Sequence, residues 1–162
     1  MQFGSMATAV AASPLMAWSR SLSVNSEHPD DLIRKLTRLN DKNIESILKR
    51  QIDKPGDRWD GGVANGYGIP NAHNTKGLIV TLGRSYASEF SKYYKSSKLE
   101  KPLEKAVSCL LNVQHEDGTI DLYSCNFHST PDTAFLVNSL APIYVCLERL
   151  NETGLEGFIK KM

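Results

Sequence analysis

The chain has 162 residues, of which 41% are hydrophobic, and its formal net charge at pH 7 is +1. This length and composition are typical of one globular unit with enough apolar side chains for a core. Because 19 Lys and Arg nearly balance 18 Asp and Glu, no overall basic field attracts nucleic acid, and the sequence carries no nucleic-acid-binding motif. We therefore expect no nucleic-acid partner.

The first segment resembles an export signal. Residues 3–17 are apolar and rich in small side chains, and the polar stretch 19–26 follows as a linker would before a mature domain. No Lys or Arg precedes this run, so the alternatives are a signal clipped at its start and an ordinary surface helix. We favour the clipped signal over 1–26, with an exported, periplasmic or secreted domain over 27–162. The run is too short to cross a bilayer, so no membrane association is expected after signal removal.

Two helices are predicted before a long break in the pattern. Pro29 can open the first helix. Asn40 is a natural N-cap for the second, which ends near Gln51. The stretch 52–71 that follows has too many glycines and turn formers for a helix or a long strand. The apolar residues at helical spacing are Leu32, Ile33, Leu36 and Leu39, then Ile44, Ile47 and Leu48.

Three more helices are predicted after the break. Helical periodicity spans 73–94. Ser97 and Glu100 match a capping box that opens the next helix, which runs to 113. The last helix restarts at 130–131, where proline stands at the favoured first position. Gly154 ends it, and the pattern over 155–162 begins another helix.

The three cysteines are an odd number, so they cannot all pair within the chain. Cys109 and Cys146 lie among apolar residues of predicted helices, and we expect both to be small core side chains. Cys125 lies in a polar loop without a nucleophile signature, which favours an unreactive thiol. The histidines and cysteines have no standard metal-ligand spacing, so we expect no metal and no cofactor.

The polar loop 114–132 is rich in titratable residues, and long loops of this kind often carry function. If successive helices run antiparallel, this loop and 52–71 open at the same end of the bundle. His73-Asn74-Thr75 and His128-Ser129-Thr130 each stand before a helix of that shared orientation. This match indicates a weak repeat of helical hairpins.

Several loop residues are candidates for catalysis. His73 and His128 stand at helix N-termini, which favour anions, and imidazole exchanges a proton near neutral pH. The alternative for each is a structural capping role. Asn126 and His128 could together neutralise a uronate carboxylate, so that a tyrosinate or histidine removes the proton on the adjacent carbon. The candidate catalytic residues are Asn126, His128, His73, Tyr67, Tyr123 and Asp121.

Other loop residues suit substrate binding. Trp59, flanked by charged neighbours, is suited to stack on a sugar ring, whereas Phe127 is expected to anchor the core. Asp117 stands in an Asp-Gly turn, where an aspartate commonly binds local backbone. The candidate substrate-binding residues are Trp59, Arg58, Asp117 and Asn74.

The runs QHEDGTID (114–121) and NFHSTPDTAF (126–135), with Gly61-Gly62 and His73-Asn74-Thr75, resemble the N-terminal helical region of heparinase II/III-like proteins. These are (α/α)-toroid polysaccharide lyases, often exported by bacteria that degrade glycans. The similarity covers roughly residues 41–151. It implies an all-α fold of antiparallel helical hairpins that form part of an incomplete (α/α) toroid.

The resemblance also implies an activity, the cleavage of uronic-acid-containing polysaccharide by β-elimination. The expected partner is then an acidic polysaccharide or oligosaccharide. In full-length members of the family, more hairpins and a β-sandwich domain follow this region, and catalytic Asn, His and Tyr residues come from several hairpins. The chain is therefore expected to be a fragment, with part of the catalytic set beyond Met162.

Two other classes fit the same residues. The first class is the toroidal glycoside hydrolases that act on unsaturated uronides, in which the pattern Q-x-x-D-G also occurs. The same pattern is found in terpene cyclase-like barrels, where the repeat is structural. In a hydrolase, Asp121 or Asp117 would be the acid or base that acts on water. The second class is a non-catalytic glycan-binding or purely structural helical array, with the loops forming a ligand cleft.

Overall fold

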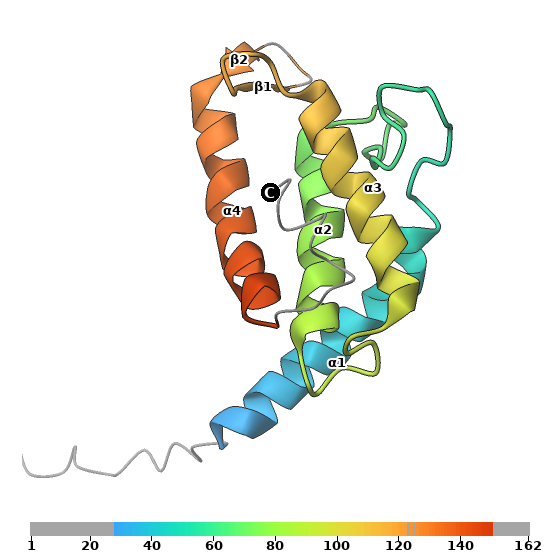
Figure 1. The fold of residues 1–162 in the computed structure, drawn as a ribbon, viewed down its shortest axis with the longest axis vertical. Helices are drawn as coiled ribbons and strands as arrows, with labels where there is room; N and C mark the ends of the chain where they lie inside the picture. The colour runs from blue at the N-terminus through green and yellow to red at the C-terminus, as the bar shows by residue number, and fades with distance from the viewer. Residues whose placement is uncertain (1–27, 123, 125, 151–162) are drawn as a thin grey trace, which may run out of the picture.

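The computed structural model of the protein describes residues 28–122, 124 and 126–150. They form four helices and one two-stranded sheet (Figure 1), so the all-α prediction is confirmed apart from a small hairpin. The predicted export signal, Tyr123, Cys125 and the helix predicted over 155–162 lie outside the described residues. The helices are α1 (Pro29–Leu48), α2 (Ala72–Ala87), α3 (Ser97–Val113) and α4 (Thr130–Arg149), and the antiparallel strands are β1 (Ile120–Leu122) and β2 (Asn126–Ser129).

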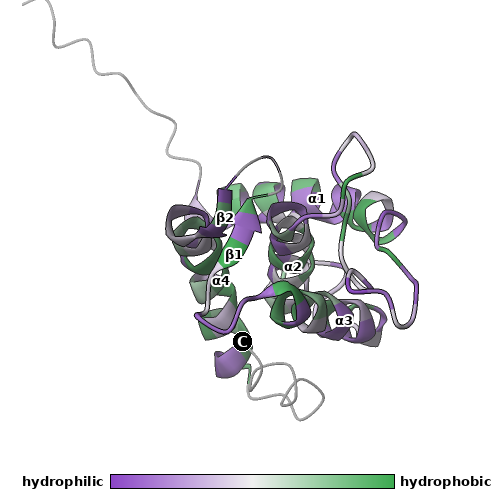
Figure 2. Ribbon diagram, turned by 90° about the horizontal axis from the view of Figure 1, so that it is seen from above, coloured by the Kyte–Doolittle hydropathy of each residue, from purple (hydrophilic) through white to green (hydrophobic). Residues whose placement is uncertain are grey.

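Helix α2 is the centre of the bundle. It packs against α1, α3 and α4, and seen from above it lies between α3 and α4 (Figure 2). Its Leu78, Ile79 and Leu82 are fully buried, as the helical spacing of apolar residues predicts. Gly83 lets α4 come close, because a Cβ there would lie 2.4 Å from Cγ2 of Ile143. In the part of the chain that the structure describes, no helix is long and apolar enough to cross a membrane.

Both long loops lie at one end of the bundle, as the sequence predicted. Nε2 of His73, in the first turn of α2, lies 3.1 Å from Oδ1 of Asp132, in the first turn of α4, so these two helices begin side by side and run parallel. Arg58, in the loop before α2, donates to the carbonyl of Val113 at the end of α3 (3.3 Å). The hairpin lies at this same end (Figure 1). The loops can therefore share one site.

The prediction of two helices before residue 52 is wrong, because α1 continues through Asn40. The amide of Asn40 does not cap a helix; it donates to the carbonyl of Thr81 and to Oγ of Ser85 on α2, both at 2.8 Å. These contacts depend on residues far away in the sequence, so the local capping pattern could not show them. Toward the start of α1, the apolar side chains Leu32, Ile33, Leu36 and Leu39 remain about half exposed.

The helix predicted over 73–94 ends early, at Ala87, and Asp41 of α1 explains why. Its buried carboxylate accepts hydrogen bonds from Oγ of Ser85 (2.6 Å), from Oγ of Ser91 (2.7 Å) and from the backbone N–H of Lys92 (3.0 Å). The segment after α2 is thereby bound to α1. A helix could not present the Lys92 N–H in this way, because that group would be engaged within the helix.

Two other local predictions are wrong. The capping box of α3 is not formed, because Ser96 is the N-cap and makes no side-chain capping bond, while Glu100 accepts from the hydroxyl of Tyr86 (3.2 Å). Cys109 is buried as predicted, but Cys146 is exposed. Cys146 lies on the exposed side of α4 although the same turn buries Ile143 and Leu147, and a run of apolar residues on both sides of Cys146 could not indicate this.

Asp41→Ala should lower the free energy of unfolding by about 3 kcal/mol, because two hydroxyls and one N–H lose a charged acceptor in a buried place. Asp41→Asn keeps an acceptor oxygen for both serines and should cost about half as much. Urea unfolding at neutral pH measures both values. Asp31→Ala, at an exposed position of the same helix, is the matched control. Equal losses in Asp31→Ala and Asp41→Ala would contradict the anchoring role.

Candidate functional site

The candidate site is a cleft of about 140 Å³ between the loop before α2 and the β1–β2 hairpin. It combines a guanidinium group, two aromatic side chains and a carboxylate, which come from two loops far apart in the sequence. Three predicted site residues, Arg58, Trp59 and Asp121, meet here. The lining residues are Arg58, Trp59, Pro70, Asn71, Ala72, Val113, Ile120, Asp121 and Phe127.

Two glycines hold the Arg58-Trp59 side of the cleft against α3. Gly61 has a φ of +87°, and a Cβ there would lie 2.3 Å from the backbone oxygen of Lys105. At Gly62 a Cβ would lie 2.8 Å from Sγ of Cys109. The loop therefore lies directly on α3, against the Lys105 backbone at Gly61 and against the Cys109 side chain at Gly62, where a Cβ would collide.

The hairpin side of the cleft is fixed on α4. Oγ1 of Thr133 accepts from the backbone N–H of Ile120 (3.0 Å) and donates to the carbonyl of Ser129 (2.7 Å). Ser129 caps α4 by accepting from the N–H of Asp132 (3.3 Å), so the predicted helix start at Thr130 is confirmed. Both strands are thus tied to the first turn of the helix.

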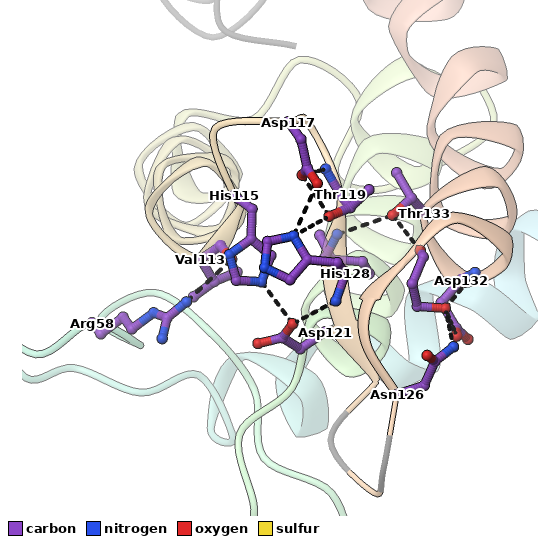
Figure 3. Close-up of polar contacts among 12 residues, drawn as sticks. Arg58, Val113, His115, Asp117, Thr119, Asp121, Asn126, His128, Asp132 and Thr133 are labelled. Atoms are coloured by element: carbon purple, nitrogen blue, oxygen red, sulfur yellow. Dashed lines mark hydrogen bonds and ion pairs between the residues drawn. The ribbon is translucent and has the colours of Figure 1, made fainter.

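Two histidines stack beside the cleft (Figure 3). The rings of His115 and His128 lie 3.8 Å apart, nearly parallel at 17°. Nε2 of His115 lies 2.6 Å from Oδ1 of Asp121, and Nδ1 of His128 lies 2.9 Å from Oδ2 of Asp117. The same Asp121 oxygen accepts from the backbone N–H of His128 (3.1 Å). Each imidazole therefore has its own carboxylate, and Asp121 connects this network to the cleft.

The backbone of His128 is strained. Its φ of +53° lies in the left-handed region, which residues other than glycine rarely adopt and which costs about 1–2 kcal/mol. The N–H bond to Asp121 and the stacking on His115 hold the residue in place. Strain of this kind occurs most often at functional sites.

The environment of Asp117 and Asp121 favours their ionised forms. Hydrogen bonds hold the pKa of Asp117 well below its usual value. The largest contributions come from the hydroxyl and the backbone N–H of Thr119, and the next comes from the imidazole of His128. The pKa of Asp121 is lowered, chiefly by the hydrogen bond from His115. A hydrolase acid needs a raised pKa to carry a proton at neutral pH, so these carboxylates are better suited to accept hydrogen bonds and orient the histidine rings than to act as that acid.

Because the pKa of Asp117 is lower in the folded state than the ordinary 3.8, its contribution to stability is present above about pH 4 and is lost as the pH falls further. We therefore expect the wild type to lose more stability between about pH 5 and pH 3 than Asp117→Asn does. Denaturant unfolding at the two pH values measures the difference. The same loss in both proteins would contradict the assigned hydrogen bonds.

A second polar network lies on the other side of the hairpin (Figure 3). Nδ2 of Asn126 donates to Oγ of Ser129 (2.8 Å), Ser129 donates to Oδ2 of Asp132, and Oδ1 of Asp132 faces His73. The structure therefore does not bring Asn126 together with His128. Ser129 is buried and bonded to a carboxylate rather than to a histidine, which does not suit a nucleophile.

The remaining predicted residues lie elsewhere. Tyr67 is 88% exposed in the turn before α2, and neither it nor Asn74 lines the cleft. Phe127 is 74% exposed at the cleft, so the prediction that it anchors the core is wrong. Burial raises the pKa of the Cys109 thiol to about 12, so it stays protonated at neutral pH.

No three His, Cys, Asp or Glu side chains within 28–122, 124 and 126–150 are grouped so that they could hold a metal ion. Comparison with protein-family models, curated proteins and solved structures gives no match. The chemistry of the cleft is therefore the basis for assigning a function.

Proposed function

We propose that the protein is a polysaccharide lyase of the (α/α)-toroid type, which cleaves uronic-acid-containing glycans by β-elimination. One observation carries the proposal: a single cleft combines Arg58, Trp59 and the carboxylate of Asp121, which is hydrogen bonded to His115. The toroid is supported by the parallel course of α2 and α4, with both long loops at one end.

The cleft suits one acidic sugar unit. The guanidinium of Arg58 can bind a carboxylate through paired hydrogen bonds. Trp59 and Phe127 offer aromatic faces to the apolar face of a sugar ring. The volume of about 140 Å³ is below the range of about 300–1,000 Å³ for pockets that hold drug-sized ligands. A single ring at the reaction centre fits this size.

The His115–Asp121 pair supplies a base. When Nε2–H of His115 donates to Asp121, the lone pair of the imidazole lies on Nδ1. Arg58 neutralises the uronate carboxylate, which acidifies the proton on the adjacent carbon, and His115 takes that proton. The electron pair left on carbon forms a C=C bond as the glycosidic C–O bond breaks. The leaving oxygen takes the proton back from the histidinium, which Asp121 stabilises.

The alternative functions are separated by one experiment. The 162-residue protein is incubated with uronate-containing polysaccharides while near-ultraviolet absorbance and reducing ends are followed together. A lyase raises both, because elimination leaves an unsaturated sugar. Reducing ends without absorbance would indicate a hydrolase, and binding without either signal would indicate a glycan-binding module. A neutral polysaccharide is the control, since it lacks the carboxylate that the mechanism requires.

A further inference from the structure

A second and larger hollow adjoins the cleft. Its volume is about 530 Å³, and it lies between the loop before α2 and the outer face of α3. Arg58 lines both the hollow and the cleft, so the two are neighbours on one surface. The hollow is therefore placed to receive a ligand that extends beyond the cleft.

The lining of the hollow has the chemistry that binds sugar hydroxyls. It offers carboxylates from Asp57 and Asp60, the ammonium of Lys105, and the amide of Asn112. Over the whole lining, three cations (Arg58, Lys101 and Lys105) balance three carboxylates (Asp57, Asp60 and Glu104), which suits hydroxyl groups better than an anion such as phosphate. Large apolar side chains are absent from the residues that line it, so a lipid or an apolar peptide fits poorly.

Part of this lining is held in place before any ligand arrives. Oδ1 of Asp60 accepts from the backbone N–H of Lys54 (2.8 Å). Nζ of Lys105 contacts Oδ1 of Asp53 (2.5 Å) and Oδ1 of Asp60 (3.5 Å). Groups that are already fixed lose less conformational entropy on binding. Arg58 is fixed in turn by its bond to Val113.

We propose that the hollow is a further sugar subsite, so that an oligosaccharide runs from the cleft across Arg58 to the outer face of α3. This inference rests on the proposed function and extends it: the substrate is an oligosaccharide of several units. The unit at Arg58 carries the carboxylate, and the units in the hollow are held through their hydroxyls.

The test compares a uronate monosaccharide with a uronate hexasaccharide by calorimetric titration of the full chain. We expect the wild type to bind the hexasaccharide about tenfold more tightly, and Asn112→Trp, which fills the hollow at an exposed position of α3, to remove that advantage. Asn112→Ala should weaken hexasaccharide binding about fivefold, as expected for one lost hydrogen bond. Neither change should alter the affinity for the uronate monosaccharide, which fills the cleft alone.

Asn138→Trp, at an exposed position of α4, is the matched control and should bind both sugars like the wild type. If the wild type binds both lengths equally, or if Asn112→Trp changes neither affinity, the subsite is overturned while the proposed function stands. If neither sugar binds to the wild type, both are overturned.

Discussion

Gly61→Ala should lower the free energy of unfolding by about 3 kcal/mol, because it combines left-handed backbone strain with a clash against α3. The added Cβ would lie 2.3 Å from the backbone oxygen of Lys105, and neither the helix nor the loop can move there without losing contacts. Urea unfolding at neutral pH measures the loss. The same change should weaken glycan binding, because the position of this loop determines where Arg58 and Trp59 lie in the cleft.

Gly56→Ala is a close control for this prediction. Gly56 has the same φ of +87°, but a Cβ there would meet nothing within 4 Å. Only the backbone strain remains, so the expected loss is about 1 kcal/mol. The difference between the two variants isolates the contact between the loop and α3. Equal losses would show that the loop does not depend on that contact.

His115→Ala should lower kcat about 10²- to 10⁴-fold with little change in KM, because it removes the base but leaves Arg58 and Trp59 to bind the sugar. Asp121→Asn should lower kcat by a smaller factor, since the imidazole stays in place without its charged partner. The initial rate of near-ultraviolet absorbance on a uronate polysaccharide measures both.

His28→Ala is the control for this second prediction, because His28 is exposed before α1. It should have the wild-type rate. If His115→Ala keeps the wild-type rate while His128→Ala loses it, the base is the other member of the stacked pair. If neither variant changes an established activity, the site is wrong.

The parts of the fold that depend on local signals could be predicted from the sequence. Ser129, Thr130 and Pro131 form an N-terminal capping signal that holds regardless of context, and α4 begins there. The continuity of α1 through Asn40 and the end of α2 at Ala87 could not be predicted, because long-range bonds decide them. The amide of Asn40 is hydrogen bonded to α2, and the carboxylate of Asp41 is hydrogen bonded to the segment that follows α2.

The candidate site was predictable by residue type more than by geometry. Arg58, Trp59 and Asp121 were expected from their chemistry and do meet in one cleft. His115 was not predicted as a site residue, because only the β1–β2 hairpin brings its ring against that of His128, and the sequence did not predict the hairpin. Asn126 was paired with His128 because the two lie close together in the loop and an amide and an imidazole can jointly neutralise a carboxylate.

The left-handed backbone of His128 and an irregular register between the two strands explain why that pair separates. Neither feature has a signal in the sequence, because histidine is not a residue that marks positive φ in the way glycine does. The loop predicted to carry the site lines the cleft through Asp121 and Phe127, whereas Asn126 and His128 belong to two separate networks within it.

Binding of an acidic sugar in the cleft between the two loops can be observed by NMR titration. Amide and indole N–H signals of the isotope-labelled protein are followed as a uronate hexasaccharide is added, with Trp59→Phe used to assign the Trp59 indole. We expect the largest shifts on the Trp59 indole and on the amides of Ile120 and Asp121, while the amide signals of Leu32 and Leu36 on α1 stay unchanged. Shifts confined to α1, or no shift at the cleft at saturating sugar, would contradict binding in the cleft.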